Sequence, residues 1–313
     1  MGVREKTTWP WGVKGWYMVD GNGLIQQRRL SDREKADVVA LAAACNAHEG
    51  LELKLNVDTP PDDDDAGGND FLYYKDGTLA GYCALDIGSG VELCGMVHPA
   101  HRRRGIGRAL LVAATAELRR RGVGKLLLIC ERNSRTGQAF VAATTAQYRF
   151  GESRMRLDLA TFHGASPPDA RLSVREAGRE DIEPLTRTLS AAFDDPREAV
   201  RARVERDLRD RDGWFNLARL DGKPIGALRV VDAGPTANIY AFGLLPAYRG
   251  RGLGRRFLDT ILDSLRAGGY VNAGLEVELE NANAMALYRS CGFIETTTYE
   301  YYALVVSPER RET

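Results

Sequence analysis

Two stretches of this sequence decide the fold, "HRRRGIGRALLVAATAELRRRG" at residues 101–122 and "YRGRGLGRRFLDTILDSLRAGG" at residues 248–269. Each carries arginines, then a glycine-x-glycine turn, then a helix whose apolar residues follow one stripe. In the second stretch this stripe comprises Phe257, Leu258, Ile261, Leu262 and Leu265. Because so specific a pattern occurs twice, the sequence indicates two similar structural units.

The repeat extends to both sides of the glycine turns. "FLYYKDGTLAG" from Phe71 matches "FNLARLDGKPIG" from Phe215, and each predicts two strands joined by an Asp-Gly turn. "KLLLICERN" from Lys125 matches "GLEVELENAN" from Gly274, and each predicts a strand after the helix. The offsets between matched positions are 145 (Gly77 and Gly222), 147 (Arg102 and Arg249) and 148 (Asn133 and Asn281). The chain is therefore predicted to be a tandem duplication.

The boundary between the two copies is predicted near residue 165. The joining segment, residues 160–178, is rich in Gly, Pro, Ser and Ala and contains Pro167 and Pro168. We therefore expect an N-terminal domain over residues 1–164, with an N-terminal extension, and a C-terminal domain over residues 165–313. The order of predicted elements indicates a mixed α/β fold in which each domain has a mixed, mostly antiparallel sheet flanked by helices.

Composition narrows the classes of function. The chain has 313 residues, of which 44% are hydrophobic and 27% charged, and no stretch is long and apolar enough for a membrane span. Its 43 basic and 43 acidic residues balance, so nucleic acid is not an expected partner. Five cysteines and four histidines form no metal-ligand spacing, so no metal is expected. We expect a cytoplasmic protein, monomeric or homodimeric. The role of Trp9, Trp11 and Trp16 is left open.

A glycine turn that opens a helix is suited to binding phosphate. The first backbone N–H groups of a helix have no partner within it and point outward at the positive end of its dipole. Glycine lets an anion approach this backbone closely, and nearby arginines can add charge-assisted contacts.

The full pattern resembles the GNAT family, the Gcn5-related N-acetyltransferases. In both halves an apolar strand and a proline precede R-x-x-G-x-G, and a further strand and an asparagine follow. The second half also contains "NANAMALYRSCGF" from Asn281, which resembles the family's N-x-x-A-x-x-L-Y-x-x-x-G-F. The resemblance implies acetyl-CoA as the cofactor and an amine as the acceptor.

The resemblance also implies which residues contact CoA. In the second half the pyrophosphate and pantetheine would lie against Phe242, Gly243, Leu244, Arg249, Gly250, Arg251, Gly252, Leu253, Gly254, Arg255 and Asn281. The equivalent residues of the first half are Gly95, Met96, Val97, Arg102, Arg103, Arg104, Gly105, Ile106, Gly107 and Arg108.

Amide formation from a thioester requires a proton donor for the thiolate and an acceptor for the amine proton. By resemblance, Tyr288 is the general acid, whereas counting from Asn133 puts Phe140 at the equivalent position of the first half. The second half is therefore the expected catalytic half. The tandem members of the family are expected to have a glutamate base where this chain has Asn238, which cannot take a proton. The base is left open among Glu276, Tyr240, Glu280, Glu92 and water.

The predicted function is acetyl transfer from acetyl-CoA to the amine of a small molecule. Two alternatives remain at this point: acetylation of a protein or peptide amine, and a CoA-binding sensor without catalysis.

Overall fold

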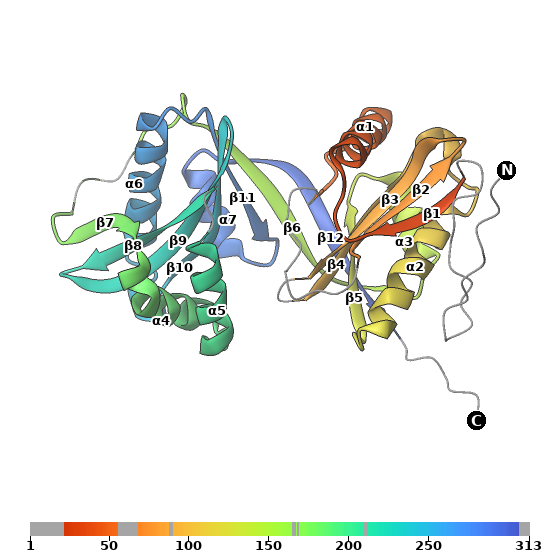
Figure 1. The fold of residues 1–313 in the computed structure, drawn as a ribbon. Coiled ribbons are helices and arrows are strands. Elements are labelled where there is room, and N and C mark those ends of the chain that lie inside the picture. The colour runs from red at the N-terminus through yellow and green to blue at the C-terminus, as the bar shows by residue number, and fades with distance from the viewer. Residues whose placement is uncertain are drawn as a thin grey trace. The chain divides into compact units, whose positions relative to one another are not determined.

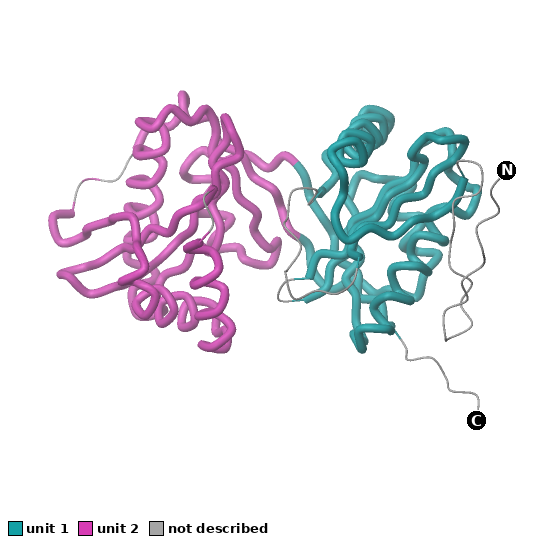
Figure 2. The backbone as a smooth tube through the Cα atoms, in the orientation of Figure 1, with its two compact units in different colours: residues 1–151, 297–313 teal, residues 152–296 magenta. Residues whose placement is uncertain are grey.

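The computed structural model describes residues 22–55, 68–87, 90–164, 167, 169–209 and 212–306. Trp9, Trp11 and Trp16 lie outside the described residues. The chain divides into two compact units, which Figure 2 shows in different colours. Unit 1 comprises residues 1–151 and 297–313, and unit 2 comprises residues 152–296.

Unit 1 contains a mixed, mostly antiparallel sheet with helices on both faces. The strand order is β1-β2-β3-β4-β5-β12, in which only β4 and β5 are parallel neighbours. Helix α2 packs on one face of this sheet and α1 on the other. The bounds are β1 Gly23–Gln27, α1 Asp32–Glu49, β2 Asp70–Lys75, β3 Thr78–Ile87, β4 Val91–Val97, the 3-10 turn η1 Pro99–His101, α2 Ile106–Arg120, β5 Lys125–Glu131, α3 Arg135–Ala142 and β12 Ile294–Val305.

Unit 2 repeats this architecture (Figure 1). Its strand order is β6-β11-β10-β9-β8-β7, in which only β10 and β11 are parallel neighbours. Helix α6 packs on one face, while α4 and α5 pack on the other. The bounds are β6 Gln147–Asp158, β7 Leu172–Ala177, η2 Arg179–Asp181, α4 Ile182–Phe193, α5 Arg197–Asp207, β8 Gly213–Leu220, β9 Lys223–Ala233, β10 Thr236–Leu244, η3 Pro246–Tyr248, α6 Leu253–Ala267, β11 Asn272–Glu278 and α7 Ala282–Ser290.

The local elements agree with the sequence patterns. The turns Asp76-Gly77 and Asp221-Gly222 both have positive φ at their two central residues, as a two-residue hairpin requires. They join β2 to β3 and β8 to β9. All five stripe residues of α6 are buried, in a core cluster that α6 forms with unit 2's sheet. The predicted mixed α/β class is confirmed.

The compact units are not the consecutive halves of the chain. We call residues 1–164 the first half and residues 165–313 the second half. The last strand of the first half, β6, pairs with β11 of unit 2 over seven register pairs, from Glu152 to Asp158. The last strand of the second half, β12, pairs with β5 of unit 1 over seven register pairs, from Tyr299 to Val305. Each half therefore supplies a strand to the other half's sheet, which the repeat pattern did not predict.

None of the helices in the described part of the chain has the length and apolar character that a membrane span needs.

Candidate active site

Strand β10 contains an irregularity directly before its C-terminal end. Its pairing with β9 runs from Thr236 to Tyr240 and resumes at Gly243, so β10 has one residue more than β9 over this interval. The extra residue produces a β-bulge, in which Ala241 has a φ of 50°. The parallel pairing of β10 with β11 comprises four pairs and ends at Ile239 and Leu275. Beyond this point the two strands separate.

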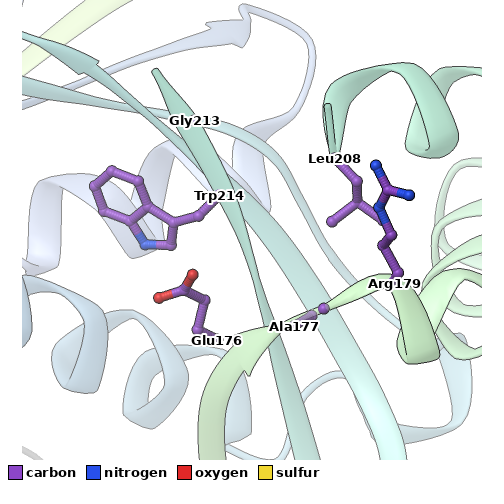
Figure 3. Close-up of a pocket in the computed structure, with 7 residues that line it drawn as sticks. Glu176, Ala177, Arg179, Leu208, Gly213 and Trp214 are labelled. Carbon is purple, nitrogen blue, oxygen red and sulfur yellow. The ribbon is translucent and has the colours of Figure 1, made fainter. Parts of the chain in front are cut away.

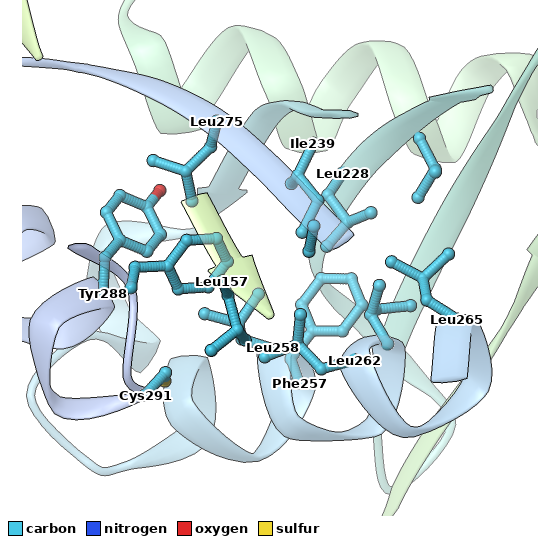
Figure 4. Packing of buried hydrophobic residues seen from close by; sticks show 14 of the residues in the cluster. Leu157, Leu228, Ile239, Phe257, Leu258, Leu262, Leu265, Leu275, Tyr288 and Cys291 are labelled. Atoms are coloured by element: carbon cyan, nitrogen blue, oxygen red, sulfur yellow. The ribbon is translucent and has the colours of Figure 1, made fainter. Parts of the chain in front are cut away.

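Where the two strands separate, successive side chains alternate between the two faces of the sheet. Tyr240 and Glu276 are the first residues beyond the last parallel pair, and alternation along the strands puts them on the same face. The Tyr240 side chain is exposed. Leu275 is on the opposite face, in the apolar cluster under α6 that also contains Tyr288 (Figure 4).

Tyr288 lies in α7 and is buried, with its ring close to Phe242 and Phe293. In Figure 4 its hydroxyl points from α7 toward Leu275. Burial and the nearby Cys291 raise the pKa of the Tyr288 hydroxyl above its usual value. The hydroxyl is therefore protonated at neutral pH and can serve as a proton donor. Asn281 caps α7, because its side chain accepts a hydrogen bond from the Ala284 N–H at 3.1 Å.

The second glycine turn ends at α6. Gly250 and Gly252 have φ values of 71° and 72°, which favour glycine, and no atom lies within 4 Å of the position of an added Cβ at either residue. The first bond of the helix runs from the Arg256 N–H to the Gly252 carbonyl. The N–H groups of Leu253, Gly254 and Arg255 in the first turn therefore have no partner within the helix and form a site suited to an anion.

The arginines of this turn have different contacts. Arg249 donates to the carbonyls of Leu244 at 3.0 Å and Ala192 at 2.6 Å, so its side chain holds the turn against β10 and α4. Arg255 donates to Asp259 and Ser290. The guanidinium of Arg251 lies over the Tyr248 ring, 5.9 Å from its centroid.

Helix α4 packs directly against the strand end that carries the bulge. A Cβ added to Gly243 would lie 2.7 Å from the Ala192 Cβ and 2.9 Å from the Phe193 ring. Glycine is therefore required by this close approach. Phe242 and Leu244 pack instead against the α6 cluster.

Glu276 forms an ion pair that the sequence did not reveal. Arg154 of β6 is its register partner and donates to Glu276 Oε1 from Nη2 at 2.9 Å and from Nε at 3.2 Å. Asn238 is two residues before Tyr240 on the same face, and a Cβ on Gly274 would collide with its amide oxygen. Asn238 thus lies directly over Gly274.

Unit 1 has the glycine turn without the bulge. Strand β4 pairs with β3 in an unbroken register from Val91 to Val97, which includes Gly95 and Met96. Arg102 donates to the Val97 carbonyl at 3.0 Å, as Arg249 does to Leu244, but its second contact is the Glu49 carboxylate. A carboxylate therefore lies beside the first glycine turn.

The conformation of the first turn otherwise follows that of the second. Arg103 has a φ of 62° where unit 2 has Gly250, and Gly105 has a φ of 83°. The first helical bond runs from the Ala109 N–H to the Gly105 carbonyl, so the amides of Ile106, Gly107 and Arg108 have no partner within the helix. Arg104 and Arg108 belong to this turn and to the first turn of α2.

The equivalent of Tyr288 in unit 1 is Val141, which corrects the count that led to Phe140. The helix caps set the register, because Ser134 and Asn281 each accept a bond at 3.1 Å from the backbone N–H three residues later. Aligned on these caps, Phe140 is equivalent to Leu287. The same offset puts Ile129 at the position of Glu276. Unit 1 therefore lacks both candidate proton-transfer groups.

A cavity of about 570 Å³ lies elsewhere in unit 2 (Figure 3). It is lined by Glu176, Ala177, Gly178, Arg179, Leu208, Gly213 and Trp214. These residues belong to β7, β8 and the adjoining turns, at the edge of the sheet away from β11. None of the predicted site residues lines this cavity.

Comparison with known proteins identifies the family of this chain. The sequence model described as "Acetyltransferase (GNAT) family" matches residues 40–142 and 180–293. The chain therefore belongs to the GNAT family and is an acetyltransferase of that type.

Curated proteins named mycothiol acetyltransferase are similar to this chain. That of Thermomonospora curvata is 31% identical over an alignment that covers 93% of this chain and 99% of the relative. That of Clavibacter michiganensis is 33% identical and covers 65% of this chain and 69% of the relative.

Solved structures share the tandem fold. A GCN5-related N-acetyltransferase from Sphaerobacter thermophilus has a TM-score of 0.76 at 18% identity, covering 91% of this chain and 96% of that chain. A tandem GNAT protein from the clavulanic acid biosynthesis pathway has a TM-score of 0.71 at 20% identity, covering 91% of this chain and 99% of that chain.

Two features of the site were missed in the sequence. The bulge at Ala241 could have been inferred from the spacing of the repeat. The offset between matched positions rises from 145 at the hairpins to 147 at the arginines, and the bulge accounts for one of these two extra residues. Arg154 had no such signal, because nothing in the sequence pairs β6 with β11.

Proposed function

We propose that the protein transfers the acetyl group of acetyl-CoA to the amine of a small molecule, and that the reaction takes place in unit 2. The observation that carries the proposal is the separation of β10 and β11 at the bulge. The glycine turn suited to phosphate follows β10, the strand that borders this opening. Tyr288 is buried on the α6 face of the sheet, and Glu276 lies on the other face. In unit 1 the parallel pairing also ends, after Leu93 and Leu128, but Val141 and Ile129 stand where unit 2 has the tyrosine and the carboxylate.

Two parts of unit 2 are suited to binding CoA, and a third residue holds the helix beside them. The backbone N–H groups of residues 250–255 would donate hydrogen bonds to the pyrophosphate, with Arg251 adding positive charge. The backbone of Phe242, Gly243 and Leu244 faces the opening and can bond the amides of pantetheine in the manner of an added strand. Asn281 caps α7, the helix that carries Tyr288.

Acetyl-CoA supplies an activated acetyl thioester, and the chain's own groups manage two protons. Tyr288 holds the proton needed at the departing sulfur. A lysine-like amine is only about 0.04% neutral at pH 7, which costs about 4 to 5 kcal/mol. Glu276 is the carboxylate at the opening and takes the amine proton, while Tyr240, on the same face of the sheet, would contact the acceptor.

For the acceptor we propose only a chemical class, the small-molecule amines. The relatives' name, mycothiol acetyltransferase, supports a small molecule and not a protein. Asn238, at the position expected to hold a glutamate base, separates this chain from that pattern, so we do not assign mycothiol chemistry to it. Unit 1 keeps a cofactor turn without the proton-transfer groups, which supports a structural or cofactor-binding role.

Calorimetric titration with acetyl-CoA tests the proposal. We would compare the wild type with two matched variants, Gly252→Leu with Gly254→Leu and Gly105→Leu with Gly107→Leu, after thermal unfolding has verified that each is folded. A panel of primary amines, including glucosamine, cysteine and a diamine, would be assayed for CoA release.

The second-turn variant should lose one binding site and all turnover. The first-turn variant reports whether unit 1 binds a second acetyl-CoA. No binding to the wild type, or turnover that depends only on the first turn, would refute the proposal.

A further inference from the structure

Strand β6 supports the part of β11 that has separated from β10. Beyond Leu275, β11 is no longer paired with β10, but Glu276, Val277 and Glu278 are still in register with Arg154, Ser153 and Glu152. The backbone of this part of the opening is therefore held by the last strand of the first half.

The same strand also holds a side chain. Arg154 contacts one oxygen of Glu276 through two nitrogens, and both side chains are mostly buried, with exposed fractions of 30% and 20%. A guanidinium that donates twice restricts the orientation of the carboxylate more than a single point charge does. The second contact thus limits the rotamers that Glu276 can adopt at the face carrying Tyr240.

In unit 1 the register position that matches Glu276 and Arg154 holds other residues. There β12 lies beside β5, and Tyr301 is in register with Ile129. The Tyr301 hydroxyl accepts a hydrogen bond from Lys54 at 2.7 Å. The strand exchange is common to both units. In unit 1 it brings Glu300 of β12 to Arg132, whereas in unit 2 it brings Arg154 to the glutamate beside the opening.

We propose that Arg154 is a positioning residue for acetyl transfer, and that it orients the Glu276 carboxylate toward the amine of the acceptor. The candidate site of the second half is then completed by a residue of the first half. This inference rests on the proposed function, because it assigns Glu276 a role in the reaction.

The test compares four variants by steady-state kinetics, using the panel amine with the highest kcat/KM as the probe. These are Arg154→Met, Arg154→Lys, Glu276→Gln and the double variant Arg154→Met with Glu276→Gln. Arg156→Met is the matched control, since Arg156 is exposed and two residues further along β6, where its register partner is Gly274.

We expect Arg154→Met to lower kcat by about 10- to 100-fold, because small displacements of a reacting group have effects of this size. The KM and Kd for acetyl-CoA should stay at the wild-type values. Arg154→Lys should recover part of kcat, and Arg154→Met should cause no further loss in the Glu276→Gln background. Arg156→Met should behave as the wild type.

The failures of the two proposals are distinguishable. If Glu276→Gln reduces kcat but Arg154→Met does not, or if the losses of the two single variants multiply, Arg154 does not act through Glu276 and the inference is wrong. If no amine of the panel is acetylated, the proposed function fails, and the inference fails with it.

Discussion

Tyr288 illustrates how a single residue acquires a chemical property from its surroundings. Its hydroxyl lies in an apolar cluster with Leu275, Phe242 and Phe293. Burial disfavours the charged phenolate, so the pKa is raised and the proton is retained. A group that keeps its proton at neutral pH is suited to donate it to a thiolate as that charge develops.

Tyr288→Phe should therefore lower kcat by about 100- to 10,000-fold, the usual contribution of general acid catalysis. Because phenylalanine keeps the ring packing, calorimetry should give the wild-type Kd for acetyl-CoA, and the melting temperature should hardly change. The raised pKa also predicts that Tyr288 adds no alkaline limb to the wild-type pH profile below about pH 10.

Tyr270→Phe is the control for this measurement. Tyr270 also packs against the α6 cluster, but it contacts Trp214 and Asp232 and is not at the opening. Equal turnover in the wild type and Tyr288→Phe would show that the tyrosine only packs and that another group protonates the departing thiolate.

At the scale of elements, the bulge in β10 distinguishes the two units more clearly than the glycine turns do. Both turns have helix-opening glycines with positive φ, at Gly105 and Gly252. Only β10 has an additional residue, and it re-aims the strand where the opening begins. Ala241 adopts a left-handed conformation that is unfavourable for alanine by about 1 kcal/mol or more. Such strain is consistent with a functional position.

Deletion of Ala241 should restore the unbroken register that β4 shows in unit 1. We expect the protein to remain folded, with a free energy of unfolding within about 2 kcal/mol of the wild type, since the strain is also removed. Acetyl transfer should fall at least about 100-fold, because the reacting groups are displaced. Urea unfolding and the CoA-release assay measure the two effects.

The reciprocal variant has an alanine inserted after Cys94 of β4. It should not create a second active site, because Ile129 and Val141 stand where unit 2 has Glu276 and Tyr288. Full activity of the Ala241 deletion would show that the bulge is unnecessary for catalysis.

At the scale of the whole molecule, the exchange of β6 and β12 makes the two halves dependent on each other. A fragment of residues 1–164 would leave β5 without the seven register pairs that β12 provides. A fragment of residues 165–313 would leave β11 without the seven pairs that β6 provides. Unpaired strand edges of this kind favour aggregation.

Each fragment expressed alone should therefore be insoluble or unfold without cooperativity, as monitored by size-exclusion chromatography and circular dichroism. The two fragments expressed together should assemble into a complex that binds acetyl-CoA. The matched controls are residues 152–296 as one continuous fragment and residues 1–151 joined by a linker to residues 297–313, since each would contain the paired strands of its own sheet. Cooperative folding of residues 165–313 alone would contradict this prediction.

Much of the fold could be predicted from the sequence because it depends on local physics. Glycines with positive φ define the hairpins and the helix starts, and the apolar stripe of α6 follows the helical period. The tandem duplication could be detected in the sequence because both copies keep the order of these local signals. Tyr288 was found through its motif, although the equivalent position in unit 1 was miscounted by one residue because the cap is Ser134 and not Asn133.

The sequence by itself thus determined the duplication, the elements, the two phosphate-suited turns and the position of the candidate acid. Only the tertiary structure decided which strands pair across the halves, where β10 bulges and which cation meets Glu276. The reason is physical: a strand's alternating pattern determines which face is buried but not which neighbour it takes. Arg154 and Glu276 are 122 residues apart in the chain, and only the pairing of β6 with β11 brings them together.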